Sequence, residues 1–142
     1  MNMNAVGIDV SKRKSTVAIL RPGGKVVVKP FDVPHLSADF QSLKKLIMDL
    51  DGETRIVMEC TGRYYEPVAR ELSQAGFFVS AVNPQIIHEF QGQGNPLRKI
   101  KTDKADSVKI ARYTLDSWAN LKQYNLMDEL RSQLKTMNRQ FS

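Results

Sequence analysis

The chain opens with three short runs rich in β-branched and other aliphatic residues, and this feature constrains its fold most strongly. The runs cover residues 5–10, 15–20 and 25–33, and each has the length and composition of a β-strand. The segment 21–24 between the last two runs holds one Pro and two Gly, which favour a tight turn. We therefore predict that the first three strands form an antiparallel meander.

Helix and strand patterns alternate after the meander. Ser37 is expected to cap a helix that ends near 51–52, with an inward face made of Phe40, Leu43, Ile47 and Leu50. A buried strand is expected over 54–60. The elements that follow it are a helix with Val68, Ala69 and Leu72 inward that stops at Gly76, a strand over 77–82, and a short helix through Phe90. This order predicts an α/β fold, with helices flanking a mixed five-stranded sheet.

A loop and a long helix complete this part of the chain. Residues 91–96, Gln-Gly-Gln-Gly-Asn-Pro, cannot hold regular structure, and we expect them to be mobile. Thr102 is a good N-cap for a helix whose first turns carry Asp103 and Asp106. The expected inward stripe of that helix is Val108, Ala111, Leu115 and Trp118.

The last residues follow another pattern. Apolar residues recur there at alternating spacings of three and four, as in a coiled-coil seam: Met127, Leu130, Leu134, Met137 and Phe141. A chain of 142 residues suits one domain, and a coiled coil of about two heptads rarely persists alone. We therefore expect a catalytic domain over 1–123 and, over 124–142, the start of a truncated coiled coil through which the chain dimerises.

Charge and metal-binding residue types narrow the function. A net charge of +6 and a pI near 9.6 favour a polyanionic partner such as nucleic acid. Cys60 is the single cysteine, and with only His35 and His88 it cannot build a zinc cage, so a bound metal must be held by oxygen. The start of the chain lacks a signal-peptide pattern, and no stretch approaches the ~20 apolar residues that span a bilayer, so we expect a cytosolic protein.

Four acids are the candidate catalytic and metal-binding residues. Asp9 and Glu59 each follow an apolar run at a strand end, and Asp103 and Asp106 share a helix face because they are three residues apart. Carboxylates gathered at one point repel one another unless cations lie among them, and Mg²⁺ and Mn²⁺ favour such oxygen ligands. Two ions about 3.5–4 Å apart can activate a nucleophile and stabilise the leaving oxygen of a phosphodiester. The acids therefore predict a two-metal nuclease-like centre.

Basic residues lie close to these acids in the sequence. We expect seven of them to bind nucleic-acid phosphates and to contribute affinity rather than sequence choice: Lys12, Arg13, Lys14, Arg98, Lys99, Lys101 and Lys104.

Each candidate has a simpler interpretation. Asp103 and Asp106 also suit any helix N-terminus, and Asp9 or Glu59 could pair with Arg55 or Lys12. Ser11 has no identifiable base nearby, so a turn-forming role is expected for it. Cys60 could react and Tyr64, Tyr65 and Trp118 could stack on bases, but these four side chains are expected to pack in the core. His35 and His88 could bind metal but are expected at the surface.

Four motifs, taken in order, resemble one family. They are Gly-Ile-Asp-Val-Ser-Lys at 7–12, Met-Glu-Cys-Thr-Gly at 58–62, Val-Asn-Pro at 82–84 and Lys-Thr-Asp-Lys-Ala-Asp at 101–106. This order resembles the N-terminal domain of DEDD transposases of the insertion-sequence one-ten family, over roughly residues 5–124. That domain is similar to RuvC-type Holliday-junction resolvases, so the resemblance implies an RNase H-like fold.

The resemblance also implies function. Asp9, Glu59, Asp103 and Asp106 match the family's four metal-binding acids. It implies DNA cleavage and strand exchange during transposition, guidance by a structured noncoding RNA, and a location at the bacterial nucleoid. A nucleophilic serine is expected from a C-terminal half outside this sequence, so the isolated chain should be incomplete. Two alternatives stay open: an actin-like sugar kinase or ATPase, and a non-catalytic scaffold that binds nucleic acid.

Overall fold

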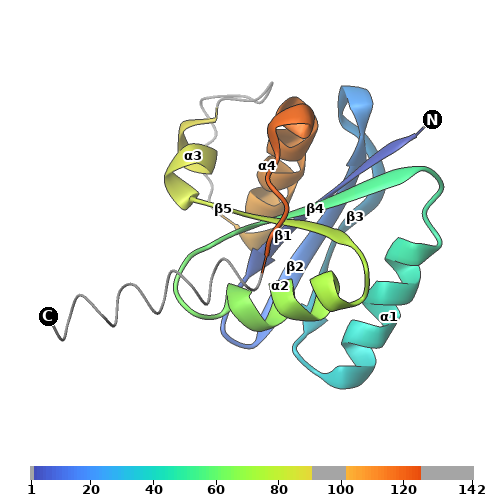
Figure 1. Cartoon of the computed structure of the whole chain (residues 1–142), viewed down its shortest axis with the longest axis vertical. Coiled ribbons are helices and arrows are strands. Elements are labelled where there is room, and N and C mark those ends of the chain that lie inside the picture. The colour runs from blue at the N-terminus through green and yellow to red at the C-terminus, as the bar shows by residue number, and fades with distance from the viewer. Residues whose placement is uncertain (1, 91–101, 126–142) are drawn as a thin grey trace, which may run out of the picture.

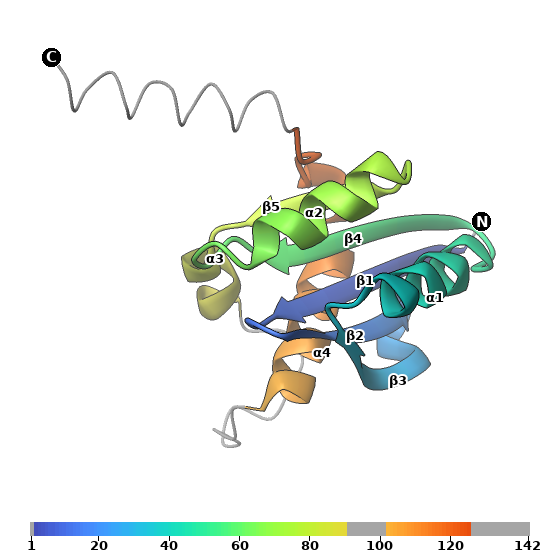
Figure 2. The same cartoon turned by 90° about the horizontal axis from the view of Figure 1, so that it is seen from below.

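The computed structural model describes residues 2–90 and 102–125, which build a five-stranded sheet with helices on both faces (Figures 1 and 2). The elements in chain order are β1 (Met3–Val10), β2 (Lys14–Arg21), η1 (Pro22–Gly24), β3 (Lys25–Pro34), α1 (Ser37–Met48), β4 (Glu53–Glu59), α2 (Tyr65–Gln74), β5 (Phe78–Val82), α3 (Pro84–Glu89), α4 (Asp103–Asp116) and η2 (Trp118–Asn120). The strand order is β3-β2-β1-β4-β5. Because β1 to β3 pair antiparallel and β4 and β5 join in parallel, the predicted meander and mixed sheet are confirmed.

One face of the sheet packs against α1 and α2. Val6 and Ile8 of β1 and their neighbours on this face form the larger apolar cluster with the buried residues of the two helices, Leu43, Ile47, Val68, Ala69 and Leu72. These are residues that helical spacing predicted to face inward, so that prediction is confirmed. Gly76 follows α2 with a φ of 95°, a conformation that L side chains rarely adopt, and it ends the helix as expected.

The opposite face packs closely against α4. A Cβ placed on Gly7 would lie within 3.0 Å of backbone atoms of Ser107 and Ala111, so only glycine fits there. Ala18, the partner of Gly7 on β2, is also small and fully buried. The helix axis can therefore approach the centre of the sheet, as the position of α4 in Figure 2 shows. Close packing of this kind fixes where the first turn of α4 lies.

The predicted inward stripe of α4 is corrected at three of its four positions. Only Ala111 of that stripe is fully buried, because the helix turns another face to the sheet, made of Ser107, Ile110, Ala111 and Thr114. The hydroxyls of Ser107 and Thr114 donate to the carbonyls of Lys104 and Ile110, both at 2.7 Å. Their burial is therefore compatible with hydrogen bonding, and their small size permits the close approach.

Two local predictions were also wrong. Leu36, not Ser37, is the N-cap of α1, and no side chain caps the helix; the Phe40 amide donates to the Leu36 carbonyl at 3.0 Å. Tyr64, expected in the core, is 48% exposed. Helix α2 begins at Tyr65, so Tyr64 precedes the helix as its N-cap and is not part of the inward face of α2.

The loop expected over 91–96 and the coiled-coil residues from Met127 onward lie outside the described residues, and the domain boundary after residue 123 stays a prediction. Tyr124 packs against the larger apolar cluster, and its amide donates to the Val79 carbonyl of β5. In the part of the chain that is described, no helix has the length and apolar character needed to cross a membrane.

Candidate active site

Sheet register gathers polar residues at one end of the strands. Asp9 pairs with Thr16 across β1 and β2, and Thr16 pairs with Asp32 across β2 and β3. On the other side of β1 the parallel ladder with β4 reaches Ile8 and Met58, so the next residue of each strand is an acid, Asp9 and Glu59. Residues in one row of a sheet point to the same face. For Asp9 this is the face of Gly7, which packs against α4.

The start of α4 brings the other two acids to this row. The Thr102 hydroxyl oxygen accepts from the Ala105 amide at 3.0 Å and caps the helix, which confirms the predicted cap. The Asp106 amide donates to the Thr102 carbonyl at 2.9 Å. Asp103 and Asp106 therefore occupy the ordered first turn of a helix that packs against β1.

Three of the four predicted acids converge. One carboxylate oxygen from each of Asp9, Asp103 and Asp106 lies within 4.8 Å of the other two. The pKa of Asp9 is raised to about 7, chiefly by burial and further by the charges of Asp106 and Asp103, a hydrogen bond with Asp103 and the charge of Glu59. Glu59 is not one of these three, but it is close enough for its charge to act on Asp9.

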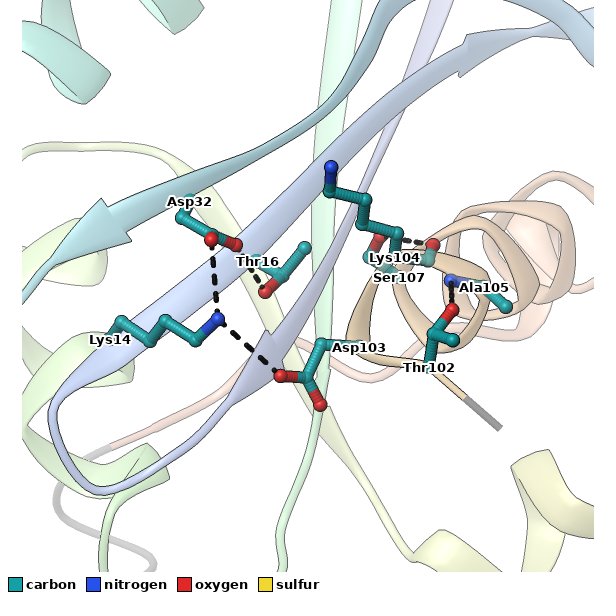
Figure 3. A network of polar contacts seen from close by, with 8 residues as sticks. All are labelled: Lys14, Thr16, Asp32, Thr102, Asp103, Lys104, Ala105 and Ser107. Atoms are coloured by element: carbon teal, nitrogen blue, oxygen red, sulfur yellow. Dashed lines mark hydrogen bonds and ion pairs between the residues drawn. The ribbon is translucent and has the colours of Figure 1, made fainter. Parts of the chain in front are cut away.

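An ion-pair network adjoins the acids (Figure 3). The Lys14 ammonium lies 3.2 Å from an Asp32 oxygen and 3.6 Å from an Asp103 oxygen. The Thr16 hydroxyl donates to the other Asp32 oxygen at 2.9 Å. This hydrogen bond, the hydrogen bond and charge of Lys14, and the charge of Lys104 lower the pKa of the exposed Asp32 carboxyl. The network therefore connects β2 and β3 to the first residue of α4.

A hollow of about 430 Å³ opens beside the acid cluster. Its lining includes Glu59 from β4, Asp106 and Lys109 from α4, and His88 from α3. The Lys109 ammonium donates to the His88 carbonyl at 3.3 Å and so links the two helices. The hollow is next to the acids and has a cation on its wall, so a phosphate-bearing ligand could enter it.

The predicted nucleic-acid-binding residues divide into three groups. Lys12 and Arg13 are exposed in the turn between β1 and β2, and Lys104 is exposed on the first turn of α4. Lys14 is paired with carboxylates, as described above. The other three, Arg98, Lys99 and Lys101, lie outside the described residues.

Two of the simpler interpretations concern Arg55, as a salt-bridge partner of the acids, and Ser11, as a turn residue. Arg55 is used elsewhere: its guanidinium lies 4.5 Å from the ring centroid of Phe78 and 4.9 Å from that of Trp118, and it pairs with Glu53 at 3.3 Å. The Ser11 amide donates to the Lys14 carbonyl at 2.8 Å, which agrees with a turn-forming role.

The histidines and the cysteine differ in setting. The His35 ring bonds the Ser15 hydroxyl at 2.8 Å and stacks on Phe40, so it is tied into the fold rather than lying free at the surface. His88 is exposed, as expected. Cys60 is partly buried instead of lying in the core.

Two residues near the site had not been singled out from the sequence. Asp32 lies on β3, and no sequence pattern indicates it: the register between β2 and β3 shifts near Ile19, so counting back from the turn would place Pro30 opposite Thr16. Lys109 is three residues after Asp106 and therefore shares its helix face. The spacing that connected Asp103 with Asp106 could have extended to it.

The donor set fits a divalent metal ion. The converging groups are hard carboxylate oxygens from β1 and α4, a set that suits Mg²⁺ or Mn²⁺. Burial and the neighbouring negative charges raise the pKa of Asp9, and a cation bound among the acids would favour its charged form.

Comparison with known proteins agrees with this geometry. The sequence model of the family described as DEDD_Tnp_IS110, Transposase, matches residues 6–142. No curated protein sequence matches the chain. Among solved structures, the chain is similar to the Thermus thermophilus RuvC structure, with 14% identity, a TM-score of 0.56, and coverage of 87% of this chain and 100% of that chain. The fold is therefore RuvC-like, of the RNase H-like class, as the resemblance implied.

Proposed function

Because this chain belongs to the family described as DEDD_Tnp_IS110, Transposase, we propose that its acid cluster is the catalytic centre of a DNA transposase or recombinase that cleaves and exchanges strands with Mg²⁺ or Mn²⁺. One observation carries the proposal: Asp9 and the pair Asp103 and Asp106, distant in sequence, bring carboxylate oxygens within 4.8 Å of one another. The RuvC-like nuclease fold and the net charge of +6 support DNA as the substrate.

The four acids would share the work of holding metal. Asp9, Asp103, Asp106 and Glu59 would bind two divalent ions, which when bound supply activation of the attacking oxygen and stabilisation of the leaving oxygen. Asp9 would release its proton as the ions bind. The Thr102 cap would keep the first turn of α4, and with it Asp103 and Asp106, in one orientation.

The hollow beside the acids suits the DNA strand. Lys109 on its wall would contact a phosphate next to the scissile bond. Phosphates further along the strand would be bound by exposed basic residues near the acids, Lys12, Arg13 and Lys104, and by Arg98, Lys99 and Lys101. These contacts would contribute affinity with a strong salt dependence and little sequence choice.

The family resemblance and, for dimerisation, the apolar spacing of residues 127–141 support four further parts of the proposal. A structured noncoding RNA would direct the protein to its DNA, and the protein would act at the bacterial nucleoid. Dimerisation through the coiled coil of residues 124–142 would bring two such domains together. A nucleophilic serine from the family's C-terminal half would complete a composite site with the acids.

Titration of Mn²⁺ by calorimetry, combined with thermal melting, tests the centre. Wild type is compared with Asp9→Asn, Glu59→Gln and Asp106→Asn. The matched control is Asp116→Asn, which removes an exposed acid at the far end of α4. Circular dichroism checks that each variant is folded.

We expect wild type and Asp116→Asn to bind Mn²⁺ and to be stabilised by it, and Asp9→Asn and Asp106→Asn to bind at least tenfold more weakly. Equal Mn²⁺ behaviour in all folded variants would overturn the metal centre and favour the scaffold alternative. The family match favours the transposase over the kinase alternative. ATP binding by the wild type would contradict the transposase proposal and favour the kinase alternative.

A further inference from the structure

Lys14 lies between two carboxylates that come from different elements. It is the first residue of β2, Asp32 lies on β3 and Asp103 begins α4. The ammonium is a hydrogen-bond donor to Asp32 at 3.2 Å, whereas Asp103 is an ion-pair partner at 3.6 Å (Figure 3). The cation is therefore attached more closely to Asp32 and reaches across to Asp103.

Asp32 is itself held in place. Its second oxygen accepts the Thr16 hydroxyl at 2.9 Å, and Thr16 is fully buried in the middle strand of the meander. Asp32 thus gives Lys14 a fixed point of attachment outside the group formed by Asp9, Asp103 and Asp106. Thr16 and Asp32 are neighbours in the sheet register, so this attachment is a property of the hairpin and does not depend on α4.

The contact between Lys14 and Asp103 is open to exchange. The side chains are 41% and 47% exposed, and ion pairs in such positions are weak and easily replaced. A divalent ion that binds Asp103 would repel the ammonium, since both are positive. Lys14 would then keep Asp32 as its partner.

We propose that Lys14 is a positioning residue that serves as an exchangeable counter-cation: it holds Asp103 in the metal-free protein and remains on Asp32 when Asp103 takes a divalent ion. This inference rests on the proposed metal centre. It separates Lys14 from the exposed Lys12 and Arg13, whose proposed partner is DNA. A lysine that only contacts DNA would not affect metal binding when DNA is absent.

The test measures Mn²⁺ affinity without nucleic acid at constant pH and ionic strength, by electron paramagnetic resonance of free Mn²⁺. The variants are Lys14→Met, Lys14→Arg and Asp32→Asn. Lys29→Met is the matched control, because it removes an exposed lysine on β3 that has no role in the network. Melting of the metal-free proteins is followed in parallel.

We expect Lys14→Met to bind Mn²⁺ about fivefold more tightly, because the competing charge is gone. Asp32→Asn should bind more weakly, because Lys14 then has only Asp103 as a carboxylate partner. Lys14→Arg should stay near wild type, since it keeps the charge, and Lys29→Met should be unchanged. Without metal, Lys14→Met should also have a lower melting temperature than wild type. Mn²⁺ should reduce this difference in melting temperature between the two proteins.

Unchanged or weaker Mn²⁺ binding by folded Lys14→Met would overturn this inference while leaving the metal centre intact. Failure of the wild type to bind Mn²⁺ would instead overturn the proposed function, and this inference with it. If Lys14→Met does not fold, Lys14→Gln decides: tighter Mn²⁺ binding than wild type supports the exchange, and unchanged or weaker binding contradicts it.

Discussion

Gly7 of β1 lies against the backbone of Ala111 in α4, so closely that a Cβ on Gly7 would come within 3.0 Å of the Ala111 nitrogen and Cα. This contact sets the distance between the strand that carries Asp9 and the helix that carries Asp103 and Asp106. Backbone atoms cannot move aside as the end of a side chain can. A single hydrogen in place of a methyl group therefore allows the acids to meet.

Gly7→Ala should push α4 away from the sheet. Overpacking of this kind costs about 1–3 kcal/mol and occasionally more, and we expect a loss of at least about 2 kcal/mol in the free energy of unfolding measured with urea. Mn²⁺ affinity should fall at least tenfold, because Asp103 and Asp106 move away from Asp9.

A control for the loss of stability is Ala38→Gly, on an exposed position of α1 across the sheet from α4. Because Ala38 lies in the first turn of the helix, the change should cost at most about 1 kcal/mol in unfolding free energy, and it should leave Mn²⁺ affinity unchanged. Wild-type Mn²⁺ affinity in Gly7→Ala would mean that this contact does not determine the site.

Stability of the metal-free protein should fall as pH rises. The pKa of Asp9 is raised from 3.8 to about 7, so the folded state keeps a proton that the unfolded state releases between these values. The stability that protonated Asp9 contributes is fully present below the unfolded-state pKa of 3.8. It is lost as pH rises through the folded-state pKa of about 7. Because Asp9 is partly exposed, solvent screens part of this effect. We therefore expect the free energy of unfolding to fall by about 1–2 kcal/mol over this pH range.

Urea unfolding in the presence of a chelator, from pH 4 to pH 8, measures this loss. Asp9→Asn cannot titrate and should have a flatter profile than wild type. The same slope in both proteins would assign the pH dependence to other groups.

Metal binding should release a proton from Asp9. Carboxylates must be deprotonated to bind metal, and Asp9 has a pKa of about 7 without it. Mn²⁺ affinity should therefore rise with pH and level off above 7. Calorimetry at pH 6.5 in two buffers with different ionisation enthalpies should give different apparent heats. Identical heats would show that no proton is released.

Thr102→Ala should loosen the first turn of α4. The lost bond from the Ala105 amide to the Thr102 hydroxyl is worth about 1 kcal/mol of unfolding free energy, as for other N-caps. Thr102→Ser keeps the accepting oxygen and should restore most of the stability. We also expect severalfold weaker Mn²⁺ binding by Thr102→Ala, because Asp103 directly follows the cap. Equal stability of the Ala and Ser variants would rule out the capping role.

Much of the fold was predictable because its signals are local. The strand runs, the turn at 21–24, the helix end at Gly76 and the Thr102 cap depend on residues close in sequence, and the structure agrees with each of them. The inward face of α4 was not predictable in the same way. Which face of α4 packs on the sheet depends on the small residues of β1 and β2 that the helix contacts. In addition, Ser107 and Thr114 do not look like core residues in isolation.

The sequence by itself determined the kinds of element, their order, and the positions of acids at two strand ends and one helix start, because strand, turn and cap preferences act over a few residues. The tertiary structure decided which charges meet. Asp9 joins Asp103 and Asp106 because α4 packs closely on Gly7, and Asp32 reaches Lys14 because of the register between β2 and β3. Register and helix approach depend on packing between distant segments, and spacing along the chain does not encode them.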